Sequence, residues 1–194
     1  MSMTYQQFVE YATDFKKHSD SIDDGWNLCQ YRCPMNESHV EYLVKKEIQK
    51  MNKSSLKSDH SDSHTEDNIP VVCEYHVLYN PSYSCPDVFF NMWYTDGKLL
   101  SLEQVWSLVH YFLKENVVRD KWNAITQEIH PFSNTPFFRL HPCKNTHVLE
   151  MLGFSSENNY EFNPLIAWLS TISPLIGLKI HLSYGNKDSK VEFT

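Results

Sequence analysis

The chain has 194 residues, of which 41% are hydrophobic and 14% aromatic. This length supports one well-buried core and is short for two, so we expect a single domain over residues 1–194. The formal net charge of −7 argues against binding to a polyanion, because nucleic-acid affinity comes from clustered Lys and Arg. Protein partners are therefore the class that we expect.

Cysteine usage and the amino terminus indicate the compartment. The five cysteines are odd in number, and no basic-then-apolar signal segment opens the chain, so we expect a reduced, cytoplasmic protein. No apolar run approaches the roughly 18 residues that span a bilayer, so no membrane insertion is expected. Cys29 and Cys33 with His39 are only a weak zinc signal, because no second cysteine pair accompanies them, and no metal is predicted. The cysteines are Cys29, Cys33, Cys73, Cys85 and Cys143.

The first half of the chain is predicted to form one helix and four strands. Thr4 and Gln7 have the spacing of a capping box, which opens a helix from about Thr4 to Lys17. Alternation of apolar and polar residues predicts the strands. In the second strand, Val40, Tyr42, Val44 and Ile48 form the apolar face, and the strand is expected near a sheet edge. The strands are predicted at Trp26–Cys33, Val40–Ile48, Val71–Tyr79 and Val88–Tyr94. One face of the third carries Val71, Cys73, Tyr75, Val77 and Tyr79, and one face of the fourth carries Val88, Phe90, Met92 and Tyr94.

Between the second and third strands, the segment from about Met51 to Asn68 is almost free of apolar residues. It cannot offset the entropy of ordering by burial, so we expect a flexible insertion at residues 51–68.

The second half is predicted to add two helices and two strands. A capping box at Ser101 and Gln104 opens a helix that ends near Glu115, and Asn163-Pro164 caps a helix that ends before Ser173-Pro174. The stretch from Trp122 to Glu128 is ambiguous and compatible with a short helix. A strand from about Thr135 leads to Cys143, a last strand or extended segment covers Leu178–Tyr184, and a frayed tail follows from about Gly185. The order predicts an α+β fold with a mostly antiparallel sheet flanked by helices.

The most informative stretch is the apolar run that ends in His141-Pro142-Cys143. A residue before proline is held extended, so His141 is expected to continue the strand. If the backbone stays extended through Pro142, the His141 imidazole and the Cys143 sulfur share a face. This pair is a candidate reactive site. The alternative is a small buried Cys143 with His141 at a strand end.

Several segments around His141-Pro142-Cys143-Lys144 resemble the autophagy-related protein ten family of ubiquitin-conjugating-like enzymes. They are Tyr75–Tyr79, Trp122–Glu128, His130-Pro131, Pro136–Phe138, Trp168–Ser170, Gly177-Leu178 and Leu182–Tyr184. The resemblance implies the ubiquitin-conjugating fold and a thioester on Cys143. It also implies transfer of autophagy-related protein twelve from its activating enzyme, autophagy-related protein seven, to a lysine of autophagy-related protein five. No cofactor is implied at this step.

Ordinary ubiquitin-conjugating enzymes place a His-Pro-Asn before their cysteine, and this chain has no such triplet. The resemblance implies that His141 and Tyr83, the latter matched by its spacing to Pro86, support the transfer instead. Ordinary aromatic packing is the other interpretation of Tyr83. Two further hypotheses for the chain stay open: a non-catalytic binding module of the same fold, and a cysteine hydrolase.

Overall fold

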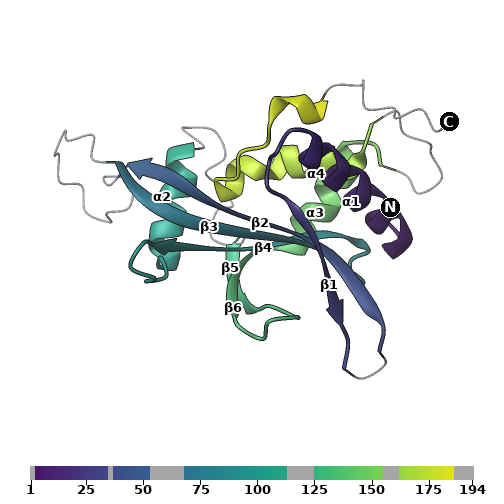
Figure 1. Ribbon diagram of the computed structural model, residues 1–194, viewed down its shortest axis with the longest axis horizontal. Helices are drawn as coiled ribbons and strands as arrows, with labels where there is room; N and C mark the ends of the chain where they lie inside the picture. The colour runs from purple at the N-terminus through teal and green to yellow at the C-terminus, as the bar shows by residue number, and fades with distance from the viewer. Residues whose placement is uncertain (1–2, 35–36, 53–67, 113–124, 155–161, 186–194) are drawn as a thin grey trace.

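The computed structural model describes residues 3–34, 37–52, 68–112, 125–154 and 162–185, without the side chains of 109–112, 143 and 144. These ranges form an α+β fold (Figure 1). In chain order, the elements are α1 (Tyr5–Ser21), β1 (Asn27–Arg32), β2 (His39–Asn52), β3 (Asn68–Asn80), β4 (Cys85–Tyr94), α2 (Leu102–Phe112), β5 (Ile125–Ile129), β6 (Pro136–Leu140), α3 (Pro142–Met151), α4 (Pro164–Ile172), and the 3-10 helices η3 (Ser173–Ile176) and η4 (Leu182–Gly185).

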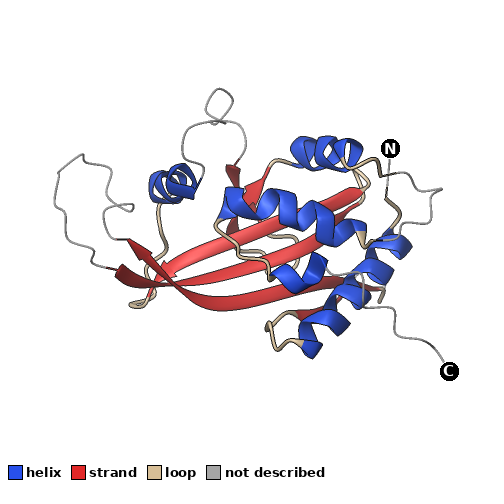
Figure 2. Cartoon of the chain, turned by 90° about the horizontal axis from the view of Figure 1, so that it is seen from above, coloured by secondary structure: helices blue, strands red, loops and turns tan. Residues whose placement is uncertain are grey.

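The described strands form a six-stranded sheet in the order β1-β2-β3-β4-β6-β5, and every neighbouring pair is antiparallel. The helices lie over one face of this sheet (Figures 1 and 2). The predicted α+β fold with an antiparallel sheet flanked by helices is therefore confirmed.

The main core lies between the helices and the face of the sheet formed by alternate residues of β3 and β4. The residues predicted to share one face of each strand point inward and pack against apolar side chains of α1 and α4; Tyr79 and Tyr94 are half-buried, and the others are buried. The opposite, outer face of the sheet carries a smaller apolar cluster made of Leu78, Phe89 and Phe137. The inward set is Val71, Cys73, Tyr75 and Val77 of β3, Val88, Phe90 and Met92 of β4, Phe8 and Phe15 of α1, and Leu165, Trp168 and Leu169 of α4.

The predicted helix starts are confirmed by their hydrogen bonds. The Gln7 backbone N–H donates to Thr4 Oγ1 (3.1 Å) and the Thr4 N–H donates to Gln7 Oε1 (2.9 Å), which completes the capping box of α1. Ser101 and Gln104 form the same pair of bonds before α2. Asn163 Oδ1 accepts from the first turn of α4. The helix α1 runs to Ser21, beyond the predicted end.

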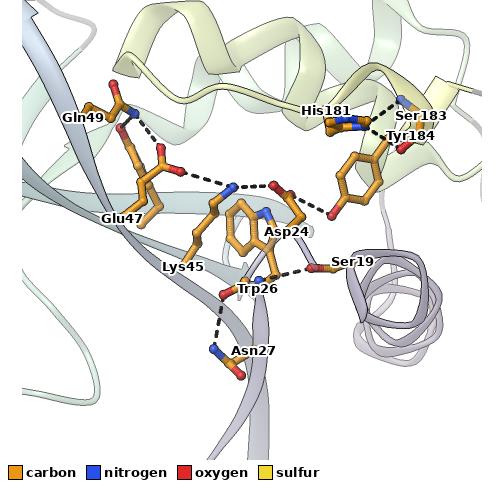
Figure 3. A network of polar contacts seen from close by, with 12 residues as sticks. Ser19, Asp24, Trp26, Asn27, Lys45, Glu47, Gln49, His181, Ser183 and Tyr184 are labelled. Carbon is orange, nitrogen blue, oxygen red and sulfur yellow. Dashed lines mark hydrogen bonds and ion pairs between the residues drawn. The ribbon is translucent and has the colours of Figure 1, made fainter. Parts of the chain in front are cut away.

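The predicted apolar face of β2 is wrong. Ile48 is 69% exposed, whereas Lys45 is only 5% exposed and faces inward. Lys45 can be buried because its Nζ lies 2.8 Å from Asp24 Oδ1 and 3.3 Å from Glu47 Oε2 (Figure 3). The strand lies near a sheet edge, as expected: it is second in the strand order, and it pairs with the edge strand β1 through His39–Val44 and with β3 through Leu43–Asn52.

Two segments differ from the prediction, and two further predicted segments fall outside the described residues. Ile125–Ile129 is the strand β5, because it pairs with β6, and residues 122–124 lie outside the described residues. The expected insertion begins too early, since Met51 is buried in β2 and Asn52 pairs with Asn68; residues 53–67 are not described. Residues 113–115, at the predicted end of α2, and the predicted tail from 186 also lie outside the description.

Leu178–Tyr184 forms no strand: residues 178–181 are irregular, and η4 follows. This segment packs through side chains, with the Tyr184 ring stacked on Phe15 at a centroid distance of 4.6 Å. Among the described helices, none is long and apolar enough to cross a membrane.

Candidate active site

The backbone around Cys143 differs from the prediction. The strand β6 ends at Leu140, and α3 begins at Pro142, so Cys143 is the second residue of a helix and not the end of a strand. Proline suits the first helical position because its fixed φ matches the helix and its missing N–H would have no partner there. The expectation of an extended backbone that places His141 and Cys143 on one face is therefore wrong. The Cys143 side chain lies outside the described part of the structure.

At the amino terminus of α3, the Cys143 position has a different electrostatic environment from the predicted strand end. The unpaired N–H groups of a first helical turn carry partial positive charge, which favours a thiolate over a thiol. The same N–H groups can donate to an oxyanion that forms beside the sulfur. A helix start therefore provides the environment that a nucleophilic cysteine requires.

Three of the other four cysteines lie where burial disfavours the thiolate. Burial raises the pKa of the Cys73 thiol to about 12 and that of the Cys85 thiol to about 11. Burial also raises the pKa of Cys29, which lies on β1. Cys33 follows β1 and is half-buried, and all four are free thiols. Cys85 at the start of β4 is thus held as a buried thiol at neutral pH.

Tyr83 lies in the loop that joins β3 to β4. Asn80 Oδ1 shapes this loop by accepting from the backbone N–H groups of Ser82 (3.0 Å) and Tyr83 (3.2 Å). The Tyr83 side chain is 43% exposed. That exposure counts against ordinary aromatic packing as its role, and it leaves the phenol accessible to a partner or a substrate.

Asp87 lies at the centre of a polar network that connects the candidate residues. Its carboxylate is 2% exposed and accepts from Arg139 Nε (2.9 Å) and Nη2 (2.5 Å), from Asn80 Nδ2 (2.9 Å) and from Asn145 Nδ2 (3.5 Å). Burial raises the pKa of this carboxyl, and Arg139 opposes that shift. Arg139 also donates to Glu128 on β5.

Each partner of Asp87 is near one candidate residue in the chain. Asn80 precedes Tyr83 by three residues, Arg139 precedes His141 by two, and Asn145 follows Cys143 by two. The structure therefore links the backbone segments of the three candidates through one buried carboxylate. Sequence reasoning missed this network. Its signal was one Asp beside one mostly apolar predicted strand and one Arg of opposite charge inside another.

A second network on the outer face was also missed. His130 Nδ1 accepts from the N–H groups of Phe132 and Ser133 (both 3.2 Å), so the neutral ring carries its proton on Nε2. That proton is donated to His76 Nδ1 (2.9 Å), and His76 Nε2 then donates to Glu74 Oε1 (2.9 Å). Burial, followed by the charge of His76, lowers the pKa of His130 to about 4. This network fixes the β5–β6 loop, at the end of β6 remote from Cys143.

Helices cover one face of the antiparallel sheet, and a cysteine lies in the first turn of the helix that follows β6. This arrangement defines an α+β protein of the ubiquitin-conjugating-enzyme type. Residues 7–183 match the family model described as autophagocytosis associated protein, active-site domain. The chain therefore belongs to this family and is a conjugating transferase of autophagy.

Two relatives give the extent of the similarity. The human protein named ubiquitin-like-conjugating enzyme ATG10 is 32% identical over 95% of this chain and 93% of its own length. The Arabidopsis thaliana protein of the same name is 32% identical over 58% of this chain and 52% of its own length.

Proposed function

We propose that Cys143 carries autophagy-related protein twelve as a thioester. It accepts the modifier from autophagy-related protein seven and passes it to a lysine of autophagy-related protein five, in the cytoplasm and within a single catalytic domain. The observation that carries this proposal is the start of α3 at Pro142, which places Cys143 in the first turn of a helix, while Cys29, Cys73 and Cys85 have raised thiol pKa values.

The transfer consists of two acyl exchanges. In the first, the Cys143 thiolate attacks the thioester carbonyl carbon of the charged activating enzyme, and that enzyme's thiolate leaves. In the second, the neutral lysine amine attacks the new thioester, the C–N bond forms, the amine gives up a proton, and the Cys143 thiolate leaves. No nucleotide or metal enters these steps, because the acyl group arrives already activated.

His141 and Tyr83 are the candidate supporting residues. His141 directly precedes α3, where an imidazole can donate to the oxyanion of the second step or take the proton from the amine. Tyr83 is exposed on the β3–β4 loop, and a phenol can donate to the same oxyanion. Replacing Tyr83 with Phe removes only the hydroxyl group. It should slow discharge to lysine while thioester formation continues.

The test is incubation with the activating enzyme, ATP and the modifier, followed by reducing and non-reducing gels. The wild-type chain should form a reducible adduct, Cys143→Ala should form none, and Cys143→Ser should form an oxyester that resists reductant. Cys33→Ala is the matched control, because Cys33 is a half-buried free thiol outside the core, and it should behave as wild type.

The same experiment decides between the proposal and its alternatives. A non-catalytic binding module would form no adduct on any cysteine. A hydrolase would release free modifier from a conjugate without an acceptor amine. A reducible adduct that persists in Cys143→Ala would identify a different nucleophile.

A further inference from the structure

Asp87 is a charged residue in a strand whose other residues are mostly apolar, and it is 2% exposed. Removing a carboxylate from water costs several kcal/mol, and a buried ion pair recovers about that amount, so an apolar pair of similar size is commonly as stable. The Asp87–Arg139 pair is therefore not needed to fill this space. What the ion pair adds is a fixed orientation of the two side chains, because charged hydrogen bonds hold their partners at fixed angles.

The orientation of the Arg139 guanidinium is fixed from three sides. Nε and Nη2 both donate to Asp87 Oδ2, Nη1 donates to Glu128, and the group lies 5.2 Å from the centroid of the Phe89 ring. The strand end that leads to His141 is thus anchored to β4 and β5 together.

On the α3 side, Asn145 is fully buried, and its Nδ2 lies 3.5 Å from Asp87 Oδ1. Its Oδ1 has no hydrogen-bond partner among the described residues. The Asp87 contact, at the long end of hydrogen-bond distances, is therefore the polar interaction that the Asn145 side chain makes among the described residues. The first turn of α3 is consequently held against β4 through Asp87.

Resting on the proposed function of Cys143, we propose that Asp87 is a positioning residue for the acyl transfer. It acts through Asn80, Arg139 and Asn145, and it sets the α3 first turn against the loop that carries Tyr83 and the strand end that precedes His141. Among the described side chains, its hydrogen-bond partners are those three residues. Misplacing a catalytic group by about 1 Å can cost on the order of 100-fold in rate, so loss of this network should slow discharge even in a variant that stays folded.

The decisive variant is the double substitution Asp87→Leu with Arg139→Met, which replaces the ion pair by apolar side chains. Asp87→Asn is the second variant, since it keeps the side-chain shape and removes the charge. Lys45→Met is the matched control, because it breaks the other buried ion pair, whose partners carry no candidate residue. Each protein is charged with the modifier, and discharge of the thioester to free lysine is followed in single turnover, which excludes acceptor docking from the rate.

We expect the double variant to keep its melting temperature within about 5 °C and to form the thioester, while its discharge rate at saturating lysine falls by on the order of 10- to 100-fold. The lysine concentration at half-maximal rate should stay unchanged, and Lys45→Met should discharge at the wild-type rate. Backbone amide NMR shifts of Cys143 and Tyr83 should move in the double variant and not in Lys45→Met.

Discharge by the folded double variant within twofold of wild type, with unmoved Cys143 and Tyr83 shifts, would overturn the positioning role. If the double variant does not fold, discharge by Asp87→Asn at the wild-type rate would overturn the role equally. A wild-type chain that forms no reducible adduct on Cys143 would instead overturn the proposed function, and the role of Asp87 with it.

Discussion

Two buried ion pairs lie on opposite faces of the sheet, and they differ in what they join. Lys45, on the helix-covered face, pairs with Asp24 and Glu47, and Asp24 Oδ2 accepts from the Tyr184 hydroxyl (3.0 Å), as Figure 3 shows. This network attaches the α1–β1 loop and the carboxyl-terminal η4 to β2. Asp87, on the outer face, instead joins the three segments that carry the candidate catalytic residues.

The comparison shows that burial and charge alone do not identify a functional network. Lys45 and Asp87 are about equally buried, at 5% and 2% exposed, and each has several polar partners. The difference lies in the chain positions of those partners. We therefore expect single substitutions that leave one charge unpaired to lower stability in both networks, and only variants of the Asp87 network to slow transfer.

The largest expected loss of stability follows from Arg139→Met alone. It leaves the Asp87 carboxylate buried without a counter-charge, which should lower the free energy of unfolding by about 3–5 kcal/mol. Urea denaturation measures the change. The control is Lys46→Met, which removes an exposed partner of Glu74 and should cost less than about 1 kcal/mol. Equal losses in the two variants would contradict the account of Asp87.

A somewhat smaller loss is expected from Lys45→Met. Asp24 and Glu47 are 16% and 24% exposed, so water compensates part of their charge, and we expect a loss of about 3 kcal/mol in the free energy of unfolding. At a temperature where the variant is folded, thioester discharge should match wild type. Slower discharge would remove the distinction between the two networks.

The pH dependence of stability provides a smaller effect, confined to the outer face. The folded-state pKa of His130 is about 4, below the usual 6.5, so the unfolded chain binds a proton first as the pH falls. Stability from this group is complete above pH 6.5 and is lost progressively toward pH 4. We expect a loss of about 2 kcal/mol between pH 7.5 and pH 5.

Urea denaturation at each pH measures this slope. The control is His130→Asn, whose side-chain oxygen can accept from Phe132 and Ser133 without titrating, and whose stability should change less over this range. A wild-type curve that is flat between pH 7.5 and pH 5 would contradict the assigned environment of His130.

Local rules predicted the elements whose signals are local. The capping residues Thr4, Ser101 and Asn163 marked real helix starts, and the alternation in β3 and β4 identified the core face, because backbone hydrogen bonding and burial act there within a few residues. Which face of β2 points into the core could not be predicted from local patterns. A lysine faces inward only when distant carboxylates pair with it, and Asp24 is 21 residues away.

The same distinction applies at the candidate site. The tripeptide His141-Pro142-Cys143 led to the prediction of a reactive thiol, which stays a prediction, and its backbone is compatible with both a continuing strand and a helix start. In the structure this segment is the helix α3, which packs against β4, and the Asn145–Asp87 contact is part of that packing. Asp87 and Asn145 are 58 residues apart, so no local pattern could have paired them.

The central claim is that the amino terminus of α3 makes Cys143 the reactive thiol of this chain. The most direct test is alkylation with iodoacetamide from pH 5 to pH 9, with mass spectrometry following each of the five cysteines separately. Cys143 should react fastest at pH 7, with a midpoint below the ordinary thiol pKa of about 8.5, while Cys73 and Cys85 should stay unmodified in the folded protein. If Cys33 or Cys29 reacts faster than Cys143 at every pH, the claim is wrong.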